Sequence, residues 1–153
     1  MREGDEAPDF EAADQHGRKV TLGELLADGP VVLFFYPRAM TRGCTAESCH
    51  FRDLAGDFAA VGARPVGISA DSVDRQASFD SRHGLGMPLL SDPDRSIAAR
   101  FGVKRLGPLF NKRATFVIGA DSRVLAVIQS EIDMDRHADR ALEVLRAAQS
   151  SAR

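Results

Sequence analysis

The run Val31-Val32-Leu33-Phe34-Phe35-Tyr36 decides the fold of this chain. Its side chains are all apolar or aromatic, and most belong to residue types that favour strands. A strand that is apolar on both faces is typical of the centre of a sheet with helices packed above and below it. The sequence therefore predicts a buried central strand over residues 31–36, which follows the turn that ends at Pro30.

Strand and helix patterns alternate on both sides of this run. Four apolar residues recur at i, i+3, i+4 and i+7, which predicts one helix from about residue 43 to residue 61. They are Phe51, Leu54, Ala55 and Phe58. The other expected elements are strands at 19–21, 65–69, 87–90, 114–118 and 124–129, helices at 22–26, 72–83, 94–101 and 134–148, and a loop through Gly107-Pro108. This order predicts an α/β fold with a central mixed β-sheet flanked by helices on both faces.

Length and composition are those of an ordinary globular chain. With 153 residues, of which 44% are hydrophobic and 27% charged, we expect a single domain over residues 1–153. The formal net charge of -2 gives no excess of positive charge, so neither nucleic acid nor a membrane is an expected partner. No apolar run approaches the roughly 20 residues that span a bilayer, and the amino terminus lacks a signal segment. We therefore expect a cytoplasmic location.

The two cysteines, Cys44 and Cys49, are the main functional clue. In a reducing compartment a close cysteine pair serves redox chemistry or a metal more often than structure. Cys44 falls in the first turn of the helix predicted after the central strand. Unpaired backbone N–H groups and the positive end of the helix dipole favour a thiolate there, so Cys44 is expected to be a nucleophile.

Cys49 follows Cys44 by five positions. On an ideal helix the two Cα atoms would lie roughly 8 to 9 Å apart, beyond the approximate 7 Å limit for a disulfide. An intact helix therefore cannot hold a disulfide between them. Two interpretations stay open: Cys49 is an inert helix residue, or the helix unwinds locally so that the two sulfur atoms meet.

Other kinds of site have weaker support in the sequence. A metal site built from Cys44, Cys49 and His50 lacks a fourth ligand, and the compact Cys-x-x-Cys spacing is absent, so no metal is expected. The missing spacing also argues against a thioredoxin-type disulfide reductase. No glycine pattern suits phosphate binding, and no cofactor is expected. A surface or capping role is expected for each of the scattered histidines, His16, His50, His83 and His137.

The segment Phe35-Tyr36-Pro37, followed by Pro37-x-x-x-Thr41-x-x-Cys44 and then by Cys49, resembles the active-site segment of the peroxiredoxins. The Cys-x-x-x-x-Cys spacing is similar to that of the bacterioferritin-comigratory-protein (PrxQ) subfamily, and the likeness extends along nearly the whole chain. The resemblance implies a thioredoxin-like fold and thiol-dependent reduction of hydrogen peroxide and small organic hydroperoxides. It also implies recycling by thioredoxin or a similar dithiol, a role in antioxidant defence, and no cofactor.

Residue roles follow from the same resemblance. Cys44 matches the peroxidatic cysteine, whose sulfenic acid Cys49 would resolve as an intramolecular disulfide. Arg113 stands where the family has its active-site arginine. Pro37 matches a residue that shields the sulfur, and Thr41 one whose hydroxyl is expected to donate a hydrogen bond to the thiolate. We expect a monomer or weak dimer.

Several alternatives stay open at this point. Glu47 either orients an arginine or lies exposed on its helix. Arg42 precedes Gly43 where the subfamily commonly has proline, and it either adds a second cation beside the thiol or points into water. For the whole chain, the alternatives are a metal carrier or redox-sensing module that kept the fold, and a one-cysteine peroxidase in which Cys49 is structural.

Overall fold

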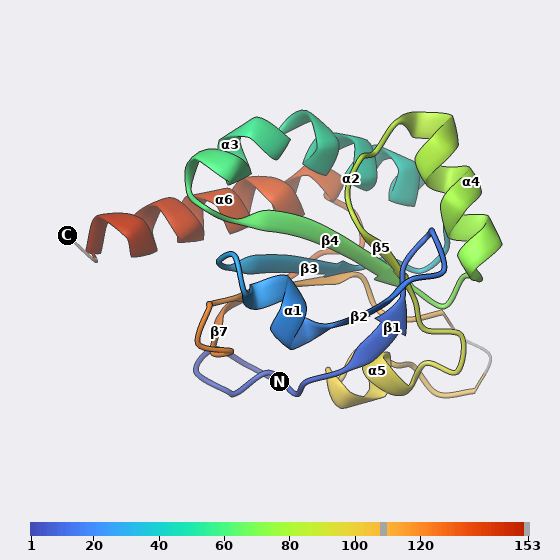
Figure 1. The fold of residues 1–153 in the computed structure, drawn as a ribbon, viewed down its shortest axis with the longest axis horizontal. Helices are drawn as coiled ribbons and strands as arrows, with labels where there is room; N and C mark the ends of the chain where they lie inside the picture. Colours follow the sequence, from blue (N-terminus) through green and yellow to red (C-terminus); the bar gives the residue numbers. More distant parts are fainter. Residues whose placement is uncertain (108–109, 152–153) are drawn as a thin grey trace.

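A computed structural model describes residues 1–107 and 110–151 of the chain. The strands of the described part are β1 (Glu11–Ala13), β2 (Lys19–Thr21), β3 (Val31–Phe35), β4 (Arg64–Ser69), β5 (Leu89–Ser91), β6 (Ala114–Ile118) and β7 (Val124–Gln129). The helices of that part are α1 (Leu22–Leu26), α2 (Arg42–Asp53), α3 (Ala55–Ala60), α4 (Val73–His83), α5 (Ser96–Arg100) and α6 (Met134–Ser151). The seven described strands form a mixed sheet in the order β2-β1-β5-β4-β3-β6-β7 (Figure 1).

β3 is the centre of this sheet. It pairs in parallel with β4 and antiparallel with β6, and its five residues are fully buried. Alternate side chains enter two separate hydrophobic clusters, one on each face of the sheet. One cluster contains Val31, Leu33 and Phe35, and the other contains Val32, Phe34 and the following Tyr36. The predicted buried central strand is confirmed.

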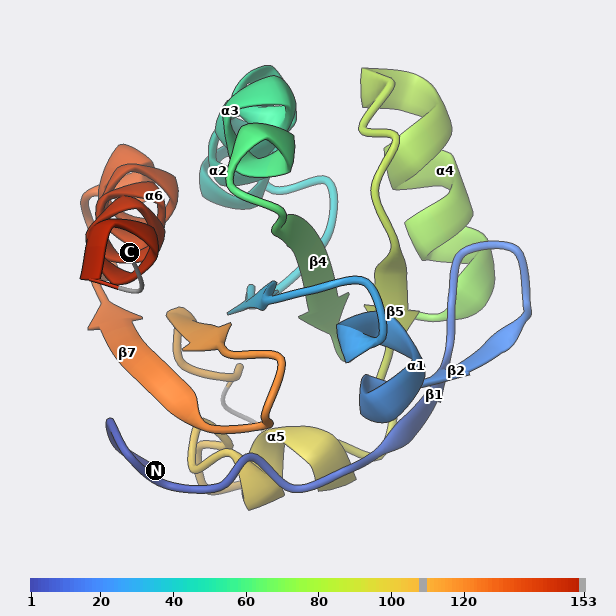
Figure 2. The ribbon, with the colours of Figure 1, turned by 60° about the vertical axis from the view of Figure 1, so that its left-hand side comes forward.

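Helices cover both faces of the sheet, as predicted. The helices α2, α3, α4 and α6 lie on one face, and α1 and α5 lie on the other (Figures 1 and 2). On the first face, aromatic residues of three helices meet the sheet: Phe51, Phe58 and Phe79. The rings of Phe51 and Phe34 stack with their centroids 4.2 Å apart. This stacking fixes α2, which carries both cysteines, against the central strand.

The long helix expected from residue 43 to residue 61 is two helices instead of one. α2 ends at Asp53 and α3 begins at Ala55, with Leu54 between them at φ -95° and ψ 7°. Phe51 and Phe58 are fully buried, whereas Ala55, expected on the same buried face, is exposed. The spacing i, i+3, i+4, i+7 describes one face of a straight helix, and it does not register a residue such as Leu54, whose backbone leaves the helical region.

No sequence pattern predicts β1. Its three residues, Glu11–Ala13, pair with β2 on one side and touch β5 on the other at the Ala13–Ser91 pair. Backbone pairing with distant strands defines this element, because glutamate and alanine have little strand propensity of their own. The remaining expected elements are present, and their ends differ from the expected ones by at most three residues. Pro108 of the expected loop lies outside the described residues.

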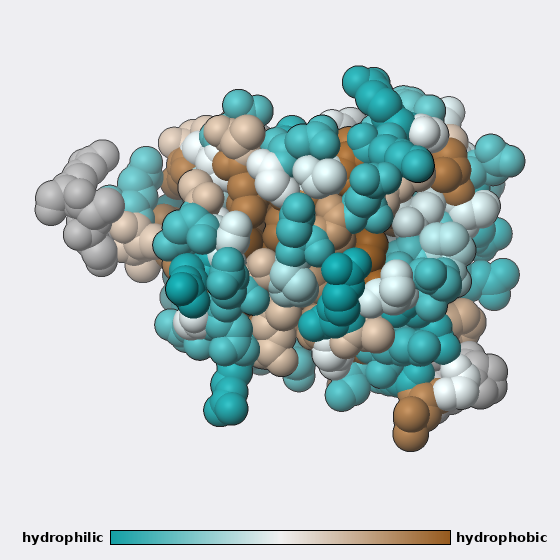
Figure 3. Space-filling view, turned by 60° about the horizontal axis from the view of Figure 1, so that its bottom comes forward, coloured by the Kyte–Doolittle hydropathy of each residue, from teal (hydrophilic) through white to brown (hydrophobic). Residues whose placement is uncertain are grey.

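The surface agrees with the modest charge and ordinary composition. Hydrophilic side chains cover most of the face that carries α5 and the amino terminus, with hydrophobic residues between them (Figure 3). Among the described residues, no helix is both long and apolar enough to cross a membrane.

The sheet brings distant residues to one edge. Because β3, β4 and β5 are parallel neighbours, their carboxyl ends share that edge. β6 runs the opposite way, with Ala114 opposite Phe35, so the residue before β6 also lies there. α2 begins a few residues after β3 ends. Ligands of open α/β sheets gather at such an edge, which is therefore the place to look for a site.

Gly67 tests the packing at the centre of the sheet. A Cβ at this position would lie 2.9 Å from Leu89 and 3.0 Å from both Phe34 and Tyr36. Gly67→Ala should therefore lower the free energy of unfolding by about 1 to 3 kcal/mol, measured by urea denaturation. Gly56→Ala is the matched control, because a Cβ on this α3 glycine meets nothing within 4 Å and alanine favours a helix. If the two substitutions change the free energy of unfolding equally, the inference that Gly67 is too tightly packed for a side chain is wrong.

Candidate active site

Cys44 lies at the amino-terminal end of α2, fully buried at the edge of the sheet. It is the third residue of the helix, and the preceding Thr41 occupies the N-cap position. The backbone N–H groups of this first turn have no helical carbonyl to bind and point toward the helix start. Together with the helix dipole they favour negative charge beside the sulfur, as the sequence predicted.

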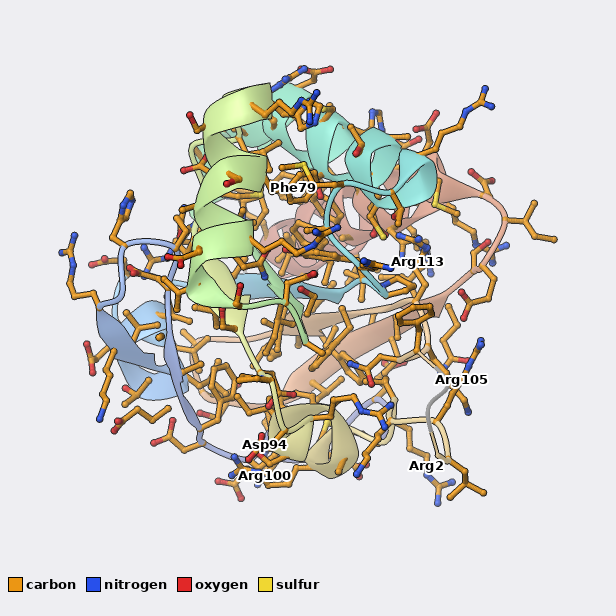
Figure 4. All side chains as sticks on the ribbon, turned by 90° about the vertical axis from the view of Figure 1, so that its right-hand side faces the viewer. Arg2, Phe79, Asp94, Arg100, Arg105 and Arg113 are labelled. Atoms are coloured by element: carbon orange, nitrogen blue, oxygen red, sulfur yellow. The ribbon has the colours of Figure 1, made fainter. Side chains whose placement is uncertain are left out.

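Arg113 provides the positive charge next to Cys44. Its Nη2 donates to Cys44 Sγ over 3.2 Å, and its Nη1 donates to Glu47 Oε1 over 2.7 Å. Arg113 is 6% exposed and lies beneath α2 (Figure 4). A Cβ on Gly43 would come within 3.3 Å of Nη2, so this glycine leaves room for the arginine. Burial acts to lower the pKa of Arg113, but the charges of Glu47 and Cys44 outweigh it and raise that pKa.

Glu47 is fully buried one turn after Cys44, which settles the alternative left open by the sequence. It orients Arg113 and is not an exposed helix residue. Burial raises the pKa of Glu47 to about 7, although the charge and hydrogen bond of Arg113 act to lower it. Its Oε2 is buried without a hydrogen-bond partner among the described residues. The carboxyl group therefore ionises at a cost to the fold.

The loop between β3 and α2 is held by two charged residues that sequence reasoning missed. Asp71 Oδ2 accepts a hydrogen bond from the Ala39 N–H at 2.7 Å, and Arg75 donates to the Ala39 carbonyl at 3.0 Å. Asp71 and Arg75 are themselves paired at 2.9 Å. The next residue, Met40, has φ +69°, a conformation that side chains disfavour. The two charged residues thus fix a strained loop through its backbone.

Thr41 and Pro37 both lie in this loop. The Thr41 hydroxyl donates to the Arg38 carbonyl at 2.8 Å. A hydroxyl has a single hydrogen, and Thr41 gives it to Arg38 instead of donating it to the Cys44 thiolate, as was expected. The lone pairs of the Thr41 oxygen can still accept a hydrogen bond. Pro37 is half-buried at the start of the loop, and Arg42 is exposed, which agrees with the interpretation that it points into water.

Cys49 lies in the same uninterrupted helix as Cys44. Both cysteines are free, Cys44 buried and Cys49 half-buried. Cys49 packs against the hydrophobic cluster that contains Cys44 and Phe51. The intact helix holds no disulfide between them, so any bond between the two sulfur atoms requires part of α2 to unwind.

His137 is a correction to the sequence analysis, which expected a surface or capping residue. It is fully buried in the first turns of α6 and binds Thr115 and the Ser130 carbonyl, each at 2.8 Å. Burial lowers the pKa of His137. Its position could have been found, because it lies four residues before Ala141 on the buried stripe of α6 that also contains Leu145.

Glu47 makes stability depend on pH. The pKa of its carboxyl is about 7 in the folded protein and 4.5 in the unfolded chain. The contribution of this group to the free energy of unfolding is therefore fully present below pH 4.5 and is lost as the pH rises through 7. The free energy of unfolding of Glu47→Gln, compared with that of the unsubstituted protein, should rise by on the order of 3 kcal/mol between pH 4.5 and pH 8. Urea unfolding with a reductant present measures this difference. Glu143→Gln, on the exposed side of α6, controls for the loss of a carboxylate as such. A pH-independent difference would contradict the expectation for Glu47.

Known proteins share both the sequence and the fold. The AhpC/TSA family matches residues 3–127. Peroxiredoxin Bcp of Bacillus subtilis is 35% identical over 149 residues, covering 94% of each chain. The crystal structure of peroxidoxin BcpB from Mycobacterium tuberculosis superposes with a TM-score of 0.93 at 58% identity, over 96% of this chain and 97% of that one.

A more distant structure concerns the alkyl peroxide reduction activity of the bacterioferritin comigratory protein of Xanthomonas campestris. It has a TM-score of 0.83 and 29% identity, over 92% of each chain. These matches confirm the predicted thioredoxin-like fold. The chain belongs to the AhpC/TSA family, among the peroxiredoxins of the bacterioferritin-comigratory-protein type.

Proposed function

We propose that this protein is a peroxidase that reduces hydrogen peroxide and small organic hydroperoxides with Cys44 as the reacting thiolate. The observation that carries this proposal is the 3.2 Å hydrogen bond from Arg113 to the buried Cys44 sulfur at the start of a helix. A thiolate is the nucleophilic form of cysteine, and both the guanidinium and the helix start favour it. The activity of the Xanthomonas relative toward alkyl peroxides supports the same substrate class.

The proposed first step is attack of the Cys44 thiolate on the peroxide O–O bond. The sulfur becomes a sulfenic acid, and the departing oxygen takes a proton to leave as water or alcohol. Negative charge therefore moves from the sulfur to the departing oxygen. Arg113 and the first N–H groups of α2 lie where they can stabilise that charge in both places. Thr41 would accept a hydrogen bond from the peroxide O–H, and Pro37 would shield the sulfur without competing for it.

The proposed second step joins Cys44 and Cys49 in an intramolecular disulfide. It needs the first turns of α2 to open, because both residues lie in one continuous helix. The loop before α2 is held at Ala39 by Asp71 and Arg75, three residues before the helix begins. Thioredoxin or a similar dithiol would then reduce the disulfide by exchange. The half-buried position of Cys49 in the same helix supports this role.

Other aspects of the proposal rest on the sequence. We propose a single functional domain over residues 1–153, a cytoplasmic location and a monomer or weak dimer, with no cofactor. A metal carrier would need a cluster of ligands. Within residues 1–107 and 110–151, His, Cys, Asp and Glu form no group of three or more that could hold a metal ion. No observation favours that second function.

Cys44→Ser tests the catalytic assignment. Serine lacks an accessible anionic nucleophile, so peroxide consumption coupled to a thioredoxin system should fall to the rate measured without the protein. Cys49→Ser is the matched control, because it should still consume one equivalent of peroxide per chain. Unchanged turnover by Cys44→Ser would exclude Cys44 as the reacting thiol.

Mass spectrometry of the oxidised protein tests the resolving role. After one equivalent of peroxide, the unsubstituted protein should lose two hydrogens, with Cys44 and Cys49 joined in one chain. Cys49→Ser should instead hold a sulfenic acid at Cys44, which a sulfenate-specific reagent traps. A stable sulfenic acid in the unsubstituted protein would favour the one-cysteine mechanism, in which Cys49 is structural.

A further inference from the structure

Behind Arg113 lies a buried acid and base pair that the proposed mechanism does not use. Glu47 and His137 are both 0% exposed, and Glu47 Oε2 lies 3.6 Å from His137 Nδ1. The two residues come from different helices, α2 and α6, which pack side by side on the same face of the sheet (Figure 2). Their meeting is therefore a product of the tertiary fold.

The hydrogen bonds of His137 fix where its labile proton sits. Nε2 lies 2.8 Å from the Ser130 carbonyl, which can only accept, so Nε2 carries a hydrogen. Nδ1 is then the nitrogen that gains or loses a proton, and in the neutral ring its lone pair accepts from the Thr115 hydroxyl at 2.8 Å. Nδ1 also lies 3.6 Å from Oε2 of Glu47, which is buried without a hydrogen-bond partner. When Glu47 is ionised and His137 neutral, this oxygen carries negative charge with no donor of its own, and one proton on the pair removes that cost.

The charges around Arg113 set when that proton is held. Arg113 binds the Cys44 sulfur with one nitrogen and Glu47 with the other. If Cys44 is a thiolate and Glu47 is ionised, two anions share one buried cation, and one added proton restores neutrality. After Cys44 becomes a neutral sulfenic acid, Arg113 and ionised Glu47 balance without the proton. Burying uncompensated charge is costly, so the oxidation state of Cys44 must alter the proton affinity of the pair.

We propose that Glu47 and His137 form a buried one-proton site that holds a proton while Cys44 is a thiolate and releases it when Cys44 is oxidised. The balanced step is Cys44–S⁻ + ROOH + H⁺ → Cys44–SOH + ROH, in which the sulfur is oxidised and the O–O bond is reduced. The proton that the pair releases matches the one that the departing oxygen takes up. His137 is thus a positioning residue for this chemistry, an inference that rests on the proposed role of Cys44.

The surroundings of the pair support this assignment. The charged and titratable groups that face it are Arg113 and Cys44, together with Glu131 and Asp133 from the segment before α6. Glu131 accepts from both the Arg113 backbone N–H and the Arg105 side chain, so its negative charge is already paired. Burial raises the pKa of Glu47 to about 7 and lowers that of His137, so a proton on the pair favours the carboxyl over the imidazole.

Proton uptake during a single oxidation tests the proposal. In Cys49→Ser protein, one equivalent of peroxide is added in weak buffer near pH 7, and a pH indicator reports protons taken from solvent per thiolate consumed. Absorbance of the thiolate is followed in parallel. Uptake well below one proton is expected, because the pair supplies the rest. With Glu47→Gln added, which stores no proton, uptake should rise to about one.

Two further variants separate the pair from its surroundings. His137→Gln, which replaces the imidazole beside Glu47 with an amide that takes up no proton, should also raise the uptake. His50→Gln is the matched control, because His50 is likewise a histidine paired with a carboxylate, Asp139, but near the surface, and should leave the uptake unchanged. Because His137→Gln could disturb the fold, an infrared difference spectrum with His137 intact gives a second readout. Oxidation should remove a protonated-carboxyl band that is absent with Glu47→Gln.

The outcomes distinguish this inference from the proposed function. If Cys44 is oxidised but uptake equals one proton with and without Glu47→Gln, the one-proton site is wrong and the peroxidase proposal stands. Proton uptake that stays low in His137→Gln, or an infrared difference spectrum without the protonated-carboxyl band, would also contradict the proposal that Glu47 and His137 form a one-proton site. If peroxide leaves Cys44 unchanged, both proposals fall.

Discussion

The site depends on one guanidinium shared by two acidic groups in the buried interior. Arg113 donates to the Cys44 sulfur and to the Glu47 carboxyl, and all three side chains are almost fully buried. A buried cation with a single acidic partner would stabilise the ionised form of that partner alone. Because Arg113 has two acidic partners, the ionisation of Glu47 and that of Cys44 affect each other through the same positive charge. Position, charge and proton content of the site therefore change together.

The sheet makes this arrangement possible. Arg113 and Cys44 are 69 residues apart in sequence, and the antiparallel register of β3 and β6 places them at one edge. A second constraint acts on the loop, where Asp71 and Arg75 hold the backbone of Ala39. These contacts order the backbone that leads into the first turn of α2, where Cys44 lies.

The sequence predicted the parts of the site that a local pattern or a family motif marks. Cys44 was expected at the start of a helix, and the resemblance pointed to Arg113 as its partner. Glu47 was left open, because a helix glutamate looks the same whether it is buried or exposed. The expectation for His137 is wrong because it considers the residue type alone and not the helical spacing that puts His137 on one face with Ala141 and Leu145. Asp71 and Arg75 were missed because they bind backbone atoms, for which side-chain motifs carry no signal.

The sequence by itself determined the central strand, the helix that starts beside Cys44 and the family. These follow from apolar runs, helical spacing and a short motif, all of which act over a few residues. The tertiary structure alone decided the break at Leu54, the pairing of β1, the donation of the Thr41 hydroxyl to Arg38 and the meeting of Glu47 with His137. Such contacts depend on how separate helices and strands pack, and the free energy of packing is shared among residues far apart in the chain.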